Sequence, residues 1–94
     1  MTIKQSVKNT FKRVGIDYET LCKIGDDGVQ WTAINWISKE QVQVHPLIFT
    51  CIGFVYETQL AYEQGKRIVN LSDFDRVRYF VLEQDSNAYN TCLD

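Results

Sequence analysis

Residues 47–57, with the sequence LIFTCIGFVYE, constrain the fold more than any other part of this chain. They form its longest run of apolar, β-branched and aromatic residues, and β-branched side chains favour the pleated surface of a strand. Apolar residues occupy both alternating faces of the run, so a strand here must be covered on both sides. Gly53 lies mid-run, where glycine often marks a bend or the close approach of another backbone. The run predicts the central strand of a small curled sheet.

Four further segments fit short strands around this central run, at residues 29–37, 60–64, 67–71 and 76–83. Connections of hairpin length join most of them, and residues 72–75 predict a single helical turn before the last strand. Five short strands in this order predict a mainly β fold, a five-stranded SH3-like or Sm-like small barrel. The alternative is an open α+β antiparallel sheet with a helix on one face.

The N-terminal segment has the apolar spacing of a helix. Apolar residues recur every three or four positions there, which predicts a helix over residues 2–14; they are Ile3, Val7, Phe11 and Val14. Gly15 follows as a helix stop, and Asp17 is placed to cap a second short helix that reaches Ile24. The chain of 94 residues is thus expected to form a single domain, with a helical cap at 1–28, a β-barrel at 29–83 and a polar tail at 84–94.

The overall charge points to no particular class of partner. Ten Lys and Arg stand against 12 Asp and Glu, so the formal net charge is −2, which gives no general attraction to nucleic acid or to anionic membranes. No segment resembles a signal peptide, and no window is apolar enough to span a bilayer. We therefore expect a cytoplasmic protein that does not bind membranes.

Residues for catalysis or metal binding are scarce. The three cysteines, Cys22, Cys51 and Cys92, form no close pair, and Cys51 is expected to be a small buried hydrophobe. His45 is the single histidine, and before a proline it is expected to be exposed to solvent. Because neither a nucleophile with a base nor a spaced ligand cluster is present, the sequence predicts a protein that is not an enzyme, with no catalytic residues, no cofactor and no metal.

A resemblance covers a little over half the chain, from about residue 29 to residue 83. Its signature consists of Trp31, Pro46, the segment 50–57 (TCIGFVYE) and the segment 69–77 (VNLSDFDRV). In these positions the chain resembles a group of small, mostly uncharacterised phage and prophage proteins with an SH3-like barrel. The resemblance implies that fold and an origin in a mobile element, and no activity. The chain departs from the group in lacking an Ile-Pro step before residue 72.

The aromatic content suggests a binding surface. Two Trp, five Tyr and five Phe exceed what so small a core needs, so some must be exposed, and exposed aromatic residues on a rigid scaffold are frequent contact residues. The candidates are Trp36, Tyr56, Tyr62 and Tyr79; for each, the alternative is that it merely covers a hairpin. We therefore expect a non-enzymatic protein-binding module of phage or mobile-element origin, which binds and could inhibit a host or phage protein.

The alternative function is that of a nucleic-acid-associated regulatory factor. It would use the basic stripe of the first helix, formed by Lys4, Lys8, Lys12 and Arg13. The second helix argues against this function, because Asp17 and Glu19 would bring carboxylates toward DNA. Self-association is a further expectation, since open sheet edges and an amphipathic helix both offer surfaces for pairing.

Overall fold

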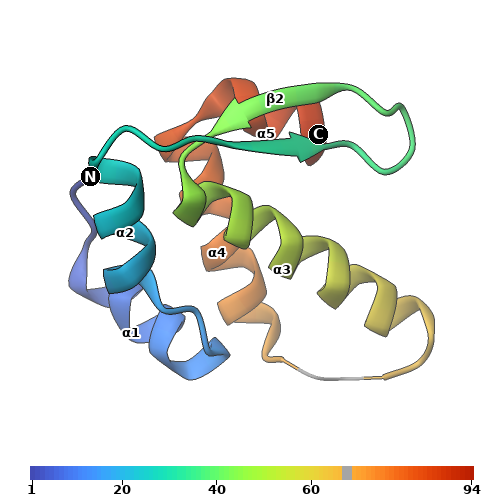
Figure 1. The fold of residues 1–94 in the computed structure, drawn as a ribbon. Helices are drawn as coiled ribbons and strands as arrows, with labels where there is room; N and C mark the ends of the chain where they lie inside the picture. Colours follow the sequence, from blue (N-terminus) through green and yellow to red (C-terminus); the bar gives the residue numbers. More distant parts are fainter. Residues whose placement is uncertain (67–68) are drawn as a thin grey trace.

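The protein is mostly helical in a computed structural model, which describes residues 1–66 and 69–94 (Figure 1). In chain order the elements are α1 (Gln5–Val14), α2 (Tyr18–Asp26), β1 (Trp31–Ile34), β2 (Gln41–Val44), α3 (Pro46–Glu63), α4 (Leu71–Gln84) and α5 (Ser86–Cys92). Within the described residues β1 and β2 are the only strands. The predicted five-stranded barrel is therefore wrong, and of the alternative, an open α+β antiparallel sheet with a helix on one face, only a two-stranded antiparallel sheet forms within the described residues.

Two helices form near the N-terminus as predicted, although α1 begins at Gln5 rather than at residue 2. In α1, Phe11 is completely buried, and Gly15 ends the helix with a left-handed φ of 83°. In α2, the Asp17 carboxylate caps the first turn by accepting a hydrogen bond from the Thr20 N–H at 3.3 Å. These signals were readable because each depends on a few neighbouring residues.

The predicted central strand is wrong, because residues 47–57 lie within the 18-residue helix α3. The buried residues of α3 recur at helical spacing; they are Pro46, Leu47, Ile48, Cys51, Ile52, Val55, Thr58 and Ala61. His45 caps the helix, since its Nδ1 accepts the Leu47 N–H at 3.0 Å, and Pro46 follows in the first turn, where its fixed φ is already helical. A run that is apolar on both strand faces is equally apolar around a helix, and its length decides for the helix.

Two more predicted strands are also helical. The strand predicted at residues 60–64 is the end of α3, and the one predicted at 76–83 lies in α4. Asn70 begins α4, because its Oδ1 accepts the Ser72 N–H at 2.7 Å, so residues 72–75 form the first turn of a long helix. Of the strand predicted at 67–71, residues 67–68 lie outside the described residues, and Leu71 already belongs to α4.

The sequence predicts a loosely held polar tail at residues 84–94, in which Tyr89, Cys92 and Leu93 could dock locally; most of this segment instead forms helix α5. The Asp85 Oδ1 caps α5 by accepting the Ala88 N–H at 3.0 Å. Ala88, Cys92 and Leu93 are buried, at the spacing of one helical face.

The strand predicted at residues 29–37 is shorter than expected and forms one arm of a hairpin. β1 pairs antiparallel with β2, with Trp31 opposite Val44 and Ile34 opposite Gln41. The connecting loop holds Trp36, and Lys39 there takes a positive φ of 65°. β1 is thus the only strand of the predicted barrel that forms within the described residues, and its partner β2 lies in a segment for which no strand is predicted.

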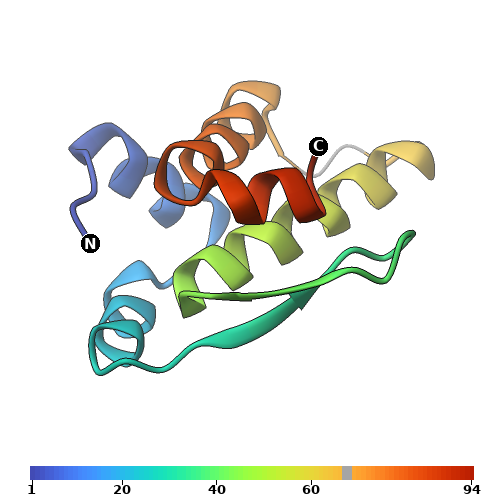
Figure 2. The ribbon, with the colours of Figure 1, turned by 90° about the horizontal axis from the view of Figure 1, so that it is seen from above.

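One hydrophobic core joins the helices and the hairpin. Helix α4 packs against α1, α3 and α5, and α2 packs against α3. The hairpin contacts α3 and α5, and in Figure 2 it runs alongside α3. Completely buried side chains come from α1, α3, α4 and α5; they are Phe11, Leu47, Cys51, Val55, Val77, Val81 and Ala88. This arrangement leaves one long side of α3 next to the free edge of β1.

The residues that carry the resemblance to SH3-like phage proteins lie mainly in α3 and α4. Segment 50–57 is helical throughout, and segment 69–77 enters α4 at Leu71. The barrel implied by that resemblance is therefore wrong, and the origin in a mobile element stays a prediction.

Candidate functional site

Helix α3 carries a second apolar stripe that does not face the core. It consists of Phe49, Gly53, Tyr56 and Leu60, spaced four, three and four residues apart on one side of the helix. Phe49 and Leu60 are exposed, and Gly53 and Tyr56 are half-buried. A helix that is apolar on nearly all sides is normally enclosed by protein, yet this side of α3 is open.

The loop of the hairpin places two more apolar side chains beside this stripe. The Asn35 Oδ1 accepts the N–H groups of Ile37 and Ser38, at 2.8 and 3.0 Å, and so folds the loop into a tight turn. Trp36 is 52% exposed and Ile37 is 95% exposed. The rings of Trp36 and Tyr56 pack with their centroids 4.5 Å apart, which joins the loop to α3.

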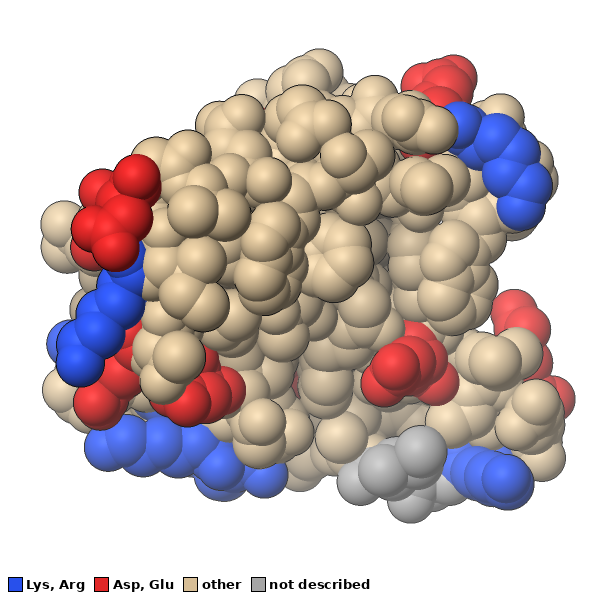
Figure 3. All heavy atoms as spheres, viewed as in Figure 1, with Lys and Arg blue, Asp and Glu red and all other residues tan. Residues whose placement is uncertain are grey.

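Two hollows flank the Trp36–Tyr56 pair, each of about 360 Å³. The first is lined by Asn35, Trp36, Ile37, Tyr56, Gln59, Leu60, Glu63, Cys92, Leu93 and Asp94. The second is lined by Thr32, Ala33, Ile34, Trp36, Phe49, Ile52, Gly53, Tyr56 and Glu57. Together they form one surface, which we call the α3 groove. Figure 3 shows this side of the molecule as a broad uncharged area with most charged side chains at its margins.

Two hydrogen bonds to α5 hold the α3 groove in shape. The Asn35 Nδ2 donates to the Thr91 carbonyl oxygen at 2.9 Å, and the Tyr56 hydroxyl donates to the Cys92 carbonyl oxygen at 2.7 Å. Burial, together with the nearby Cys92, raises the pKa of Tyr56 to about 12, so its hydroxyl stays a donor at neutral pH. The groove therefore exists before any partner arrives, which reduces the entropic cost of binding.

The four predicted contact residues fall in three places. Trp36 and Tyr56 lie together in the α3 groove. Tyr62 is half-buried: its hydroxyl donates to the Val69 carbonyl oxygen at 2.8 Å, and its ring packs against Phe74. Tyr79 is 63% exposed on α4, away from the groove. The structure thus brings two of the four together.

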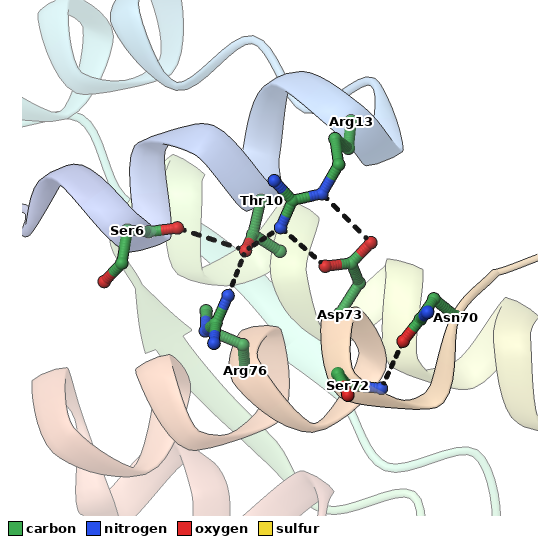
Figure 4. Close-up of polar contacts among 7 residues, drawn as sticks. All are labelled: Ser6, Thr10, Arg13, Asn70, Ser72, Asp73 and Arg76. Carbon is green, nitrogen blue, oxygen red and sulfur yellow. Dashed lines mark hydrogen bonds and ion pairs between the residues drawn. The ribbon is translucent and has the colours of Figure 1, made fainter.

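The predicted basic stripe is partly occupied by contacts within the chain. Arg13 donates to Asp73 from Nη2 at 2.8 Å and from Nε at 3.3 Å, and these hydrogen bonds hold the pKa of Asp73 below its usual value (Figure 4). The Lys8 ammonium lies 5.9 Å from the centre of the Tyr18 ring. Lys4 and Lys12 are exposed, and neither has an ion pair within the described residues.

The three cysteines and the histidine are partly or fully buried, and of these four residues only Cys92 lines the α3 groove. Burial raises the pKa of all three thiols, which disfavours the nucleophilic thiolate; they belong to Cys22, Cys51 and Cys92. Cys51 is fully buried, as predicted. His45 is half-buried rather than exposed, because its ring packs against Gly25, where a Cβ would overlap the imidazole. No cluster of three His, Cys, Asp or Glu residues able to hold a metal occurs in the described part of the chain.

Several residues of the α3 groove were missed at the level of sequence. The sequence places Ile34, Ile37, Phe49 and Leu60 in predicted strands, and Gly53 is explained there as a bend or the close approach of another backbone. The signal was present in the spacing of residues 49, 53, 56 and 60, which is visible once the run from 46 to 63 is treated as one helix. It was hidden because the same residues also fit two strands.

Comparison with protein families, with curated proteins and with solved structures gives no match to this chain. In the described residues, no helix is both long enough and apolar enough to cross a membrane. The α3 groove is therefore interpreted from its own geometry.

Proposed function

We propose that this protein is a non-enzymatic protein-binding module that holds its partner in the α3 groove. The observation that supports the proposal is the anchored Trp36–Tyr56 pair, with apolar residues exposed on both of its sides. Trp and Tyr are the side chains that most often dominate binding energy, above all where neighbouring apolar contacts exclude water. A partner seated there would cover the apolar side of α3 that the fold leaves open. By occupying a surface of that partner, the module would also inhibit it.

Nucleic-acid binding through α1 is the weaker candidate. Arg13 and Lys8 already contact Asp73 and Tyr18, which leaves two of the four basic residues to attract phosphate. A salt titration with duplex and single-stranded DNA tests this alternative. Affinity that falls steeply with salt and disappears in a Lys4→Gln, Lys12→Gln double variant would favour it over the α3 groove.

The proposal is tested with variants inside and outside the groove. Proteins captured from a cell lysate by the wild type are identified, and the purified partner is titrated against Trp36→Ala, Ile37→Ser and Tyr79→Ala by calorimetry. We expect Trp36→Ala to weaken binding about 30-fold, the loss typical of a central aromatic contact, and Ile37→Ser to weaken it less. Tyr79→Ala should leave affinity within about 2-fold, because Tyr79 lies on α4, away from the groove.

Melting curves of each variant provide the control for folding. Ile37 is almost fully exposed, so Ile37→Ser should not change the melting temperature. A partner whose affinity is unchanged by both groove variants, or reduced equally by Tyr79→Ala, would contradict the proposal.

A further inference from the structure

The edge of β1 that faces away from β2 carries unpaired backbone groups. Ala33 lies opposite Val42, and the Asn35 N–H donates to the Glu40 carbonyl oxygen at 2.9 Å. In an antiparallel pair, hydrogen-bonded residues alternate with residues whose N–H and C=O point outward. The N–H and C=O groups of Thr32 and Ile34 therefore point away from β2. Within the described residues they form no hydrogen bond to another part of the backbone.

This free edge opens into the α3 groove. Thr32, Ala33 and Ile34 line the second hollow, and its other wall is the outer stripe of α3. In Figure 1, β1 lies between β2 and α3, so its unpaired side is directed toward that helix. A segment placed in the hollow would have backbone groups on one side and apolar side chains beneath it.

At Gly53 the side of α3 that lines the groove has no side chain, so the helix backbone is accessible there. A Cβ built on Gly53 meets no atom within 4 Å, so no described part of the fold requires a glycine here. Glycine inside a helix costs about 0.5–1 kcal/mol relative to alanine. A residue that costs stability and relieves no crowding within the chain fits the close approach of a backbone from outside.

The charges around the groove select the side chains of that segment. Glu57, Glu63 and Asp94 line the two hollows, and no lysine or arginine does so among the described residues. A second copy of this chain placed symmetrically on the groove would oppose carboxylates to carboxylates, which is unfavourable. A partner with lysine or arginine beside apolar residues is complementary.

We propose that the α3 groove takes an extended segment of the partner protein, which pairs with β1 as a third antiparallel or parallel strand. Alternate apolar side chains of this segment pack on Phe49, Gly53 and Tyr56, and its lysine or arginine residues face Glu57 and Glu63. Strand addition of this kind draws affinity from main-chain hydrogen bonds and specificity from alternate side chains. The inference rests on the proposed function, whose groove and anchoring residues it uses.

The test starts from a random decapeptide library displayed on phage and selected on the immobilised wild-type protein. We expect the enriched peptides to alternate apolar residues with lysine or arginine. The decisive variants are Thr32→Pro and Gln43→Pro. Thr32 and Gln43 lie opposite each other, and each variant removes the same side-chain hydrogen bond between them. Thr32→Pro deletes an N–H on the edge facing the groove, whereas Gln43→Pro deletes one on the far edge.

We expect Thr32→Pro to weaken binding of an enriched peptide at least 10-fold, and Gln43→Pro to leave its affinity within 3-fold. A second test changes the peptide instead of the protein, so that it does not depend on the variant folding. In an extended peptide, the N–H groups of alternate residues point to opposite edges, and only one of these edges would pair with β1. Methylating the backbone nitrogens on that edge should abolish binding, and methylating those on the other edge should not. Equal effects of the two proline variants, or of the two methylated sets, would overturn strand addition.

Failure of this inference is distinguishable from failure of the proposed function. Enriched peptides with apolar residues at helical spacing, sensitive to Trp36→Ala but indifferent to both proline variants, would refute the third strand and keep the groove as a binding site. Enriched peptides that are insensitive to Trp36→Ala, or the absence of any enrichment, would count against both.

Discussion

Two regions of the molecule differ in which groups are satisfied within the chain. One is the contact between α1 and α4, and the other is the α3 groove. At the first, the Thr10 hydroxyl donates to the Ser6 carbonyl oxygen and accepts from both Arg13 and Arg76, while Arg13 also binds Asp73 (Figure 4). In the groove, apolar side chains are exposed and the edge of β1 is unpaired. Arg13, which the sequence offers as a contact for nucleic acid, is thus bound within the fold. The outer apolar side of α3, which the sequence places in the core, is exposed.

The largest effect that separates these regions comes from removing a phenylalanine from each. Phe11→Ala in α1 should lower the free energy of unfolding by about 3–5 kcal/mol, because the ring is completely buried against Phe80 and Tyr18. Phe49→Ala in α3 should lower it by about 1 kcal/mol or less, since Phe49 is 39% exposed and contacts Trp31 at one edge. Urea unfolding followed by circular dichroism measures both.

If Phe11→Ala does not fold, the pair Phe11→Leu and Phe49→Leu preserves the comparison. Similar losses at the two positions would mean that the outer side of α3 is part of the core. The distinction between a surface used by the fold and one left open would then fail.

The next largest effect is expected from Asp73→Asn, which breaks the polar contact between α1 and α4. The hydrogen bonds from Arg13 lower the pKa of Asp73 in the folded state, so the contact stabilises the protein above the ordinary carboxyl pKa and is lost as the pH falls through the lowered value. Thermal melts from neutral to acidic pH should therefore show less loss of stability in Asp73→Asn than in the wild type. Asp75→Asn, exposed in the same turn of α4, is the matched control. An unchanged acid dependence in Asp73→Asn would show that the contact contributes nothing to stability.

A smaller effect is expected from Tyr56→Phe, which removes a polar anchor of the groove but keeps its ring. The lost hydrogen bond to Cys92 should cost about 1 kcal/mol. Burial raises the pKa of Tyr56 to about 12 from the ordinary 10.0, so its contribution is complete below pH 10.0 and disappears as the pH rises toward about 12. Titration of tyrosinate absorbance should show a late-titrating component that is missing in Tyr56→Phe and kept in Tyr79→Phe. If no tyrosine titrates late, the Tyr56 hydroxyl is accessible to solvent and not buried in the groove.

Much of the N-terminal part could be predicted from sequence, because its signals are local. The left-handed stop at Gly15 and the Asp17 cap each involve residues within one helical turn. The hairpin was predicted in part, since the alternation around Trp31 and Ala33 is that of a strand with one face on the core. The polar anchors could not be predicted, because Asn35 and Thr91 are 56 residues apart in the sequence.

The strand predicted at residues 47–57 was wrong because β-branched residues also occur in buried helices. Ile48, Ile52 and Val55 favour strands intrinsically, but burial against α4 and the hairpin outweighs a preference of a few tenths of a kcal/mol per residue. Asn70 and Asp85 cap α4 and α5, but the sequence places Asn70 in the predicted strand 67–71 and Asp85 in the predicted polar tail, so neither helix is predicted. Trp36 and Tyr56 were predicted as contact residues for their chemistry, without knowledge that the fold would bring them together.

Gly53 gives the smallest and most specific test, because its effects on stability and on binding should have opposite signs. Gly53→Ala should raise the free energy of unfolding by about 0.5–1 kcal/mol, since the added Cβ enters open space and alanine is the better helix former. Gly65→Ala should lower it, because Gly65 has a φ of +77°, which alanine adopts at a cost. If a backbone lies over Gly53 in the complex, the stabilised Gly53→Ala protein should nevertheless bind its peptide more weakly, and Gly53→Leu more weakly still. A Gly53→Ala protein that gains stability and keeps full affinity would show that no backbone of the partner lies over residue 53. The groove would then bind its partner through Trp36 and its neighbours alone.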